Sequence, residues 1–111
     1  MAQNFRRFIE RNIGTSAVDV PDGSNFDSYD AIIGVHLANV TGSTINVDVY
    51  VANSSNNYHL VKNAPIPSGS ALQLIDGGAK IVVATGDRLY IKSDTASSLD
   101  AWVSVVDSIS T

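Results

Sequence analysis

Hydrophobic and polar residues alternate most clearly in the middle of the chain, over residues 45–51. Ile45, Val47, Val49 and Val51 occupy every second position, and polar or aromatic residues fill the positions between them. Alternation with period 2 predicts a strand with one buried and one exposed face. The preceding residues 30–40 are apolar on both alternating sets, which is typical of a strand covered on both faces. Residues 30–52 therefore predict two neighbouring strands at the centre of the fold.

Shorter apolar runs on both sides of this pair also have the character of strands. They cover residues 15–20, 58–63, 70–75, 80–84, 88–93 and 99–106. Turn residues separate them about every 8–12 positions, and two prolines in 64–69 predict a stiff segment that crosses between sheets. No helical pattern lies between the strands, which argues against a parallel α/β sheet. The fold class that we predict is all-β: an antiparallel β-sandwich, jelly-roll or Ig-like, of about eight strands with an N-terminal arm.

The first residues do not share the alternation of the rest. Phe5, Phe8, Ile9 and Ile13 fit helical spacing, whereas Asn12 and Gly14 would allow an extended arm to leave the body. We therefore leave helix and extended arm open, and divide the chain into an arm, residues 1–14, and a β-sandwich domain, residues 15–111. We expect the apolar arm residues to be buried against another subunit. Removing residues 1–13 should then leave a folded domain that no longer assembles.

Charge supports a separate role for this segment. Residues 1–13 carry three arginines and one glutamate, a balance of +2, whereas the remainder of the chain has a balance of −6. An acidic body argues against nucleic-acid binding, and a basic arm on it suits docking onto an acidic surface, such as a second copy of the chain. A solvated, frayed terminus is the alternative. The candidate assembly arm consists of Phe5, Arg6, Arg7, Phe8, Ile9 and Arg11.

Length and composition limit the remaining possibilities. The chain has 111 residues and no cysteine, so we expect one domain without disulfides or thiolate metal sites. No apolar run approaches the roughly 20 residues of a membrane helix. The N-terminus lacks the apolar centre of a secretion signal. We expect a protein that does not act on membranes.

No group of residues predicts a reaction. His36 and His59 are better interpreted as one core or interface histidine and one surface histidine than as metal ligands or a general base. Asp22, Asp27 and Asp30 fall in a loop that could bind calcium, but their spacing is not that of a calcium loop, and aspartates also form turns. Asp76-Gly77-Gly78 predicts a hairpin turn rather than a phosphate loop. We expect no enzyme activity, no catalytic or metal residues and no cofactor.

Four aromatic residues fall on or near the polar set of their strands: Tyr50, Tyr58, Tyr90 and Trp102. If they share one face, they could stack on sugar rings, bury against a partner or fill a second covered core. Aromatic residues are enriched in protein interfaces, so we take these four as candidate interface residues. Carbohydrate binding is the alternative.

Several segments together resemble small virion proteins of tailed bacteriophages, especially phages of cyanobacteria and other aquatic bacteria. The segments are NFRRFIERNIGTSAVDV, IIGVHLANVTGSTINVDVYV, YHLVKNAPIPSGSALQLI and GGAKIVVATGDRLYIKSDTASSLDAWVSV, and they cover nearly the whole chain. The resemblance implies a non-enzymatic β-sandwich structural protein made in the host bacterial cytoplasm and located in the virion. It supplies no site residues.

The pattern and the resemblance together predict an accessory structural protein that forms a homo-oligomer at the head–tail neck or tail region. Its partners would be itself and other virion proteins. A capsid decoration (cement) protein is the first alternative, and a carbohydrate-binding or host-adhesion module is the second. The sequence leaves the position in the particle and the number of subunits open.

Overall fold

The computed structural model describes residues 4–20, 31–75, 81–84 and 86–107. The described residues contain nine strands and no helix, and none of them forms a helix that could cross a membrane. The strands are β1 (Asn4–Ile13), β2 (Val18–Val20), β3 (Ala31–Asn39), β4 (Ile45–Asn53), β5 (Asn56–Ile66), β6 (Ala71–Ile75), β7 (Ile81–Val82), β8 (Arg88–Ser93) and β9 (Leu99–Asp107).

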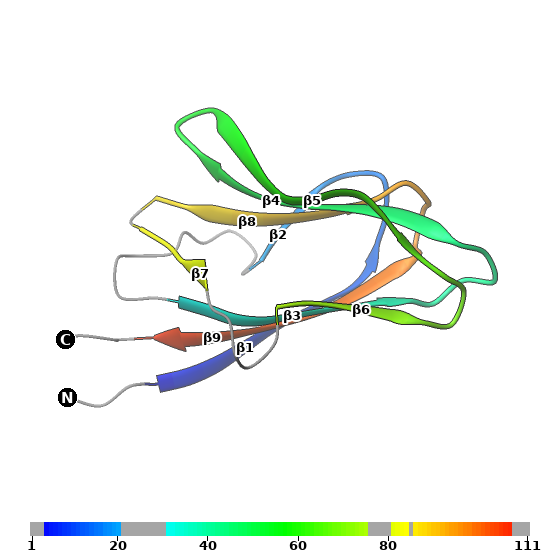
Figure 1. The fold of residues 1–111 in the computed structure, drawn as a ribbon, viewed down its shortest axis with the longest axis horizontal. Helices are drawn as coiled ribbons and strands as arrows, with labels where there is room; N and C mark the ends of the chain where they lie inside the picture. Colours follow the sequence, from blue (N-terminus) through cyan, green and yellow to red (C-terminus); the bar gives the residue numbers. More distant parts are fainter. Residues whose placement is uncertain (1–3, 21–30, 76–80, 85, 108–111) are drawn as a thin grey trace.

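Two antiparallel sheets pack face to face, which confirms the predicted β-sandwich (Figure 1). Sheet A has the strand order β1-β9-β3-β6, with β7 paired to the beginning of β3. Sheet B has the order β2-β8-β4-β5. Large aliphatic side chains from both inner faces form the core, and the largest fully buried ones are Ile13, Ile32, Leu37, Ile45, Ile66, Leu89, Ile91 and Leu99.

The strand pairing is nested along the chain. The first strand pairs with the last, β2 with β8, β3 with β6, and β4 with its neighbour β5. This is the jelly-roll arrangement, in which a long folded-over ladder of strand pairs wraps into two sheets. Of the two sandwich types predicted from the sequence, the jelly-roll is therefore the one that forms.

The N-terminal segment is extended. Residues 4–13, which we expected to form an arm apart from the sandwich domain, form the edge strand β1 of sheet A and pair with β9. Ile13 is buried in the core, and Phe8 packs partly against it. The backbone carbonyls of Ile13 and Gly14 accept hydrogen bonds from Ser98 N (3.1 Å) and Ser93 N (2.9 Å). The segment therefore completes the sandwich instead of standing outside it.

Strand β3 is covered completely on its inner face and only partly on its outer face. Ile32, Val35 and Leu37 are all fully buried, although their positions are not of one parity. An irregularity in the pairing with β9, between Ile32 and Gly34, shifts the alternation and makes this possible. The outward His36 is exposed, so the described residues do not supply the second cover predicted for this strand.

Strand β5 is longer than predicted. It runs from Asn56 through Pro65 to Ile66, so the segment that crosses to sheet A begins only after Ile66. Pro65 is tolerated because β5 is the edge of sheet B, where one side of the strand has no ladder partner. The turn before β5 has two residues with positive φ, Ser54 (50°) and Ser55 (71°), as two-residue hairpins require.

Candidate functional site

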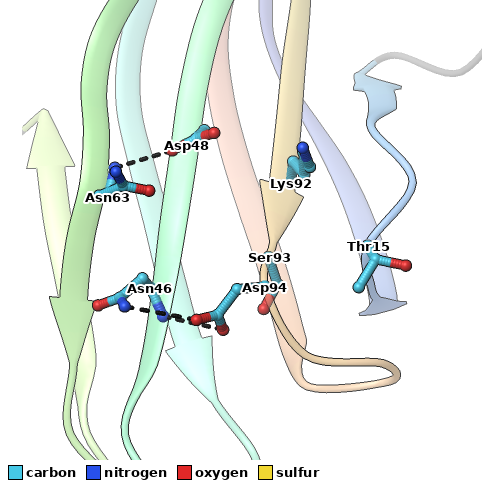
Figure 2. Close-up of a pocket in the computed structure, with 7 residues that line it drawn as sticks. All are labelled: Thr15, Asn46, Asp48, Asn63, Lys92, Ser93 and Asp94. Atoms are coloured by element: carbon cyan, nitrogen blue, oxygen red, sulfur yellow. Dashed lines mark hydrogen bonds between the residues drawn. The ribbon is translucent and has the colours of Figure 1, made fainter.

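The outer face of sheet B carries a polar groove of about 260 Å³ (Figure 2). It is lined by Thr15, Asn46, Asp48, Asn63, Lys92, Ser93 and Asp94. The alternation of β4 and β8 turns Asn46, Asp48 and Lys92 outward, because the residues between them fill the core. The groove contains two carboxylates and one lysine, so we tested it first for catalytic or metal-binding chemistry.

Both carboxylates in the groove bind the local backbone. Asp48 Oδ1 accepts a hydrogen bond from Asn63 N at 2.8 Å, in the part of β5 where the pairing with β4 shifts register and Asn63 has a φ of 53°. Asp94 Oδ1 accepts a hydrogen bond from Asn46 N at 3.1 Å. This bond, with a second from the Thr95 hydroxyl, lowers the pKa of Asp94 below its usual value. A carboxylate held in its charged form is a poor proton donor. The two carboxylates are therefore better explained by their hydrogen bonds to the backbone than by a role as catalytic acids.

No nucleophile and base meet in this groove. Ser93 Oγ is buried and lies 2.6 Å from Ser98 Oγ. His59 lies on β5 beside Tyr50, and His36 lies on the opposite sheet with Nδ1 2.8 Å from Gln73 Oε1. In the part of the chain that the structure describes, no group of three or more side chains could hold a metal ion. The loop with Asp22, Asp27 and Asp30 and the turn at Asp76 lie outside the described residues.

A row of three rings crosses the same face beyond the groove. Tyr50 stacks on Tyr90, with ring centroids 5.4 Å apart and planes 19° apart, and lies 5.0 Å from the ring of His59. The rings come from the adjacent strands β8, β4 and β5. Partial burial, with Tyr90 and Asp48 nearby, raises the pKa of the Tyr50 phenol. Because Tyr50 has a ring on either side, it does not offer a free face on which a sugar could stack.

The outer face of sheet A carries a second cluster, which we call the sheet A patch and define as Arg7, Ile9, His36, Gln73 and Trp102. Ile9, Trp102, His36 and Gln73 are register partners across four adjacent strands. The side chains of Ile9 and Trp102 are 48% and 49% exposed, which is unusual for residues of their size. The Arg7 guanidinium carbon lies 5.2 Å from the centroid of the Trp102 ring, within cation–π range.

The four candidate interface aromatics do not share one face. Tyr50 and Tyr90 lie together on sheet B, and Trp102 lies on sheet A. Tyr58 is 60% exposed at the end of β5 near the Ser54–Ser55 turn. Strand parity alone could show which residues point outward, but not which sheet each strand joins.

The candidate arm residues lie on both sides of strand β1. Arg7 and Ile9 face outward in the sheet A patch, whereas Arg6 and Phe8 lie opposite inward residues of β9. Arg11 is exposed and lines a shallow groove of about 430 Å³ with Trp102 and Asp100. The side chain of Phe5 lies outside the described part of the structure. Gln73 and the seven residues that line the groove were not among the residues predicted from the sequence. The outward alternation of β4 and β8 was a signal for Asn46, Asp48 and Lys92.

The comparisons with known proteins give a fold and no family. No protein-family model matches the chain, and no curated protein matches it. A solved structure from the work "Bacillus endospore appendages form a novel family of disulfide-linked pili" is similar, with a TM-score of 0.54 and 15% sequence identity. The alignment covers 98% of this chain and 88% of the other. At this identity the similarity shows that the two chains share a fold along nearly their whole length.

Proposed function

We infer that this protein is a non-enzymatic structural subunit that assembles with copies of itself in the virion of a tailed bacteriophage. The observation that carries the proposal is the sheet A patch. Ile9 and Trp102 are about half exposed on adjacent strands, beside the guanidinium of Arg7. Tryptophan and arginine are enriched in the centres of protein interfaces, and a partner would remove these apolar surfaces from water.

The similar pilus protein supports the structural part of this proposal. The work that describes it reports endospore appendages that form pili, so a chain with this fold and of similar length can serve as a repeated building unit. That pilus family is disulfide-linked, whereas the present chain has no cysteine. Assembly of the present chain would therefore not use disulfide links. Many symmetry-related copies would multiply a modest interface through avidity.

The location in a phage particle rests on the resemblance of the sequence segments to small phage virion proteins. We propose the head–tail neck or tail region as the position and the capsid surface, as a decoration protein, as the alternative. Gold labelling of the protein in purified particles, viewed by electron microscopy, distinguishes the two. Absence of the protein from purified particles would contradict both positions.

Sedimentation velocity of the purified chain at increasing concentration tests self-assembly. We expect larger species to appear, and expect Trp102→Ser to reduce them because it removes the largest exposed side chain of the patch. Val40→Ser is the matched control, since Val40 is 52% exposed outside the patch. A chain that stays monomeric at every concentration, and is absent from particles, would contradict the proposal.

Carbohydrate binding remains the second candidate because Trp102 is half exposed. Arg7 covers one face of its ring, so a sugar would have to use the other face. Titration with host polysaccharide, followed by the fluorescence of this single tryptophan, tests this function. A saturable change would favour it over assembly, and no change would count against it.

A further inference from the structure

The edges of the two sheets differ in how well they could accept another strand. An edge strand presents unpaired backbone donors and acceptors, and natural proteins usually shorten, bend or interrupt such edges. Strand β2 has three residues, β6 has five, and β7 has two. Strand β5 is long, but it contains Pro65, a left-handed Asn63 and two register shifts. Among the described strands, these four edges are therefore protected.

Strand β1 is the exception. It has ten residues, and its pairing with β9 is regular from Asn4 to Glu10 before the register shifts towards Ile13. It contains no proline, and its left-handed residue, Asn12, lies beyond the regular part. The side of β1 away from β9 is the end of sheet A. A regular edge of this length can accept a strand from another chain.

The side chains of β1 determine which strand would fit. Arg6, Phe8 and Glu10 lie opposite the inward residues Val105, Val103 and Ala101, and so belong to the inner side of the strand, while Arg7 and Ile9 belong to the outer side. The Arg6 guanidinium carbon lies 5.6 Å from the centroid of the Phe8 ring, as expected for residues on the same side. On the inner side of β1, a basic, an aromatic and an acidic side chain therefore follow one another, with Phe8 at the centre.

This order is self-complementary in an antiparallel pair of identical strands. In such a pair, a two-fold axis places one residue of β1 opposite the same residue of the second copy. When that residue is Phe8, Arg6 of each copy faces Glu10 of the other. On the outer side, Arg7 of each copy then faces Ile9 of the other. The two neighbouring registers are less favourable electrostatically. Centring the pair on Arg7 places Arg7 opposite Arg7, and centring it on Ile9 places Arg7 opposite Arg11. Like charges directly opposite destabilise a strand pair, and opposite charges stabilise it.

We propose that two copies of this chain pair through their β1 strands, antiparallel about Phe8, so that sheet A continues from one copy into the other. This proposal rests on the self-assembly inferred above and gives it an interface. The exposed Ile9 would lie beside Arg7 of the second copy, which extends the sheet A patch across the junction. The two-fold symmetry closes the contact after two copies, so the patch remains for further assembly.

Charge exchange tests the register. Arg6→Glu places glutamate opposite Glu10, and Glu10→Arg places arginine opposite Arg6, so each variant alone should weaken the dimer by about tenfold or more. An equimolar mixture of the two variants should restore dimers, because every facing pair then has opposite charges. Arg11→Glu is the matched control, since it makes the same change of charge outside the proposed Arg6–Glu10 contacts. Sedimentation velocity measures all four samples.

Cross-linking tests the geometry with variants at exposed positions, which should not impair folding. The chain has no cysteine, so Arg7→Cys and Ile9→Cys each introduce a unique thiol. Under oxidation, a mixture of the two should form disulfide-linked dimers, because these positions face each other. Each variant alone should not, because its two thiol-bearing residues would lie about 8 Å apart, beyond disulfide reach.

The outcomes separate this proposal from the function on which it rests. Rescue by mixing, together with cross-links only in the mixed sample, supports the β1 pairing. Oligomers that survive both charge variants unchanged, or that never cross-link, overturn the pairing and leave self-assembly intact. A wild-type chain that remains monomeric overturns both.

Discussion

At the scale of single residues, the buried side chain of Asn39 connects sheet A to sheet B and to the turn that follows β3. It is 3% exposed, and its amide nitrogen donates to Ser43 O (2.8 Å) and to Ile66 O (2.9 Å) on the other sheet. Its carbonyl oxygen accepts hydrogen bonds from both the backbone and the hydroxyl of Thr41. All four hydrogen-bonding capacities of the amide are thereby used.

Asn39→Ala should lower the free energy of unfolding by about 2–3 kcal/mol, because it leaves buried backbone groups without partners. Asn57→Ala, at an exposed position of β5, is the control and should change it by less than about 0.5 kcal/mol. Urea denaturation followed by circular dichroism measures both. Equal effects of the two variants would show that the buried amide has no special role.

The lowered pKa of Asp94 predicts how the stability of the folded protein depends on pH. Its pKa is lowered in the folded protein, first by the hydrogen bond from Asn46 N and then by that from Thr95, so the folded state binds its proton more weakly than the unfolded state. The stabilisation is therefore present above the usual pKa of 3.8 and is lost as the pH falls through and below it. Urea denaturation between pH 6 and pH 3 should show a shallower loss for Asp94→Asn than for wild type, and parallel curves would contradict this.

At the scale of elements, strand β1 is held to the body by its end. Ile13 is 1% exposed, whereas Ile9 of the same strand is 48% exposed. Ile13→Ala should destabilise the protein by about 2–5 kcal/mol through the lost contacts and the cavity left behind, and Ile9→Ala should cost less than about 1 kcal/mol. Thermal denaturation distinguishes them, and a similar change for the two would mean that β1 is not anchored by its end.

The same packing changes the expectation for truncation. We expected from the sequence that removal of residues 1–13 would leave a folded domain. In the structure this removal takes a core side chain and one of the two strands that pair with β9. We now expect the truncated chain to lose its cooperative unfolding transition, which calorimetry measures. A sharp transition close to that of the full chain would show that β1 is dispensable for folding.

Strands with clean alternation could be predicted from the sequence nearly to the residue. Strand β8 covers residues 88–93 as predicted, and β4 extends the prediction by one residue. The local pattern of residues did not predict the structure where the conformation of a segment depends on a strand that is distant in the sequence. The spacing of Phe5, Phe8, Ile9 and Ile13 fits a helix, but pairing with the edge of β9 makes the segment a strand. Likewise, the shift in β3 after Ile32 follows from its pairing with β9, which no local alternation reveals.

The candidate site could be predicted less completely than the fold. Outward alternation identified Tyr50, Tyr90 and Trp102 as surface residues, and the basic N-terminal segment was singled out by its charge. Their grouping into the aromatic row of sheet B and the sheet A patch depends on which strands are neighbours. That order is set by the nested pairing of the whole chain, and so by contacts between residues far apart in sequence.

At the scale of the whole molecule, the nested pairing makes most strand contacts long-range. Only β4 and β5 pair across a two-residue turn, while β1 and β9 join the two ends of the chain. Folds dominated by such contacts close large loops before they gain stabilising contacts, and therefore fold slowly, in milliseconds to seconds. Trp102 lies beside β1 and is the single tryptophan. Its fluorescence in stopped-flow refolding should thus report the docking of β1, and a submillisecond phase with full amplitude would contradict this.

The register that places Asn4 opposite Asp107 has a consequence for engineering. A protein whose first and last strands are neighbours has, in effect, a ring-like connectivity that is interrupted at one place. Joining the ends by a short flexible linker and cutting the backbone between Ser54 and Ser55 should give a circular permutant with the same sandwich. In that permutant, β9 and β1 would form an ordinary hairpin. The edge strand would then be attached by a local connection, and a tag or fused domain could be placed at the Ser54–Ser55 turn of sheet B without touching β1.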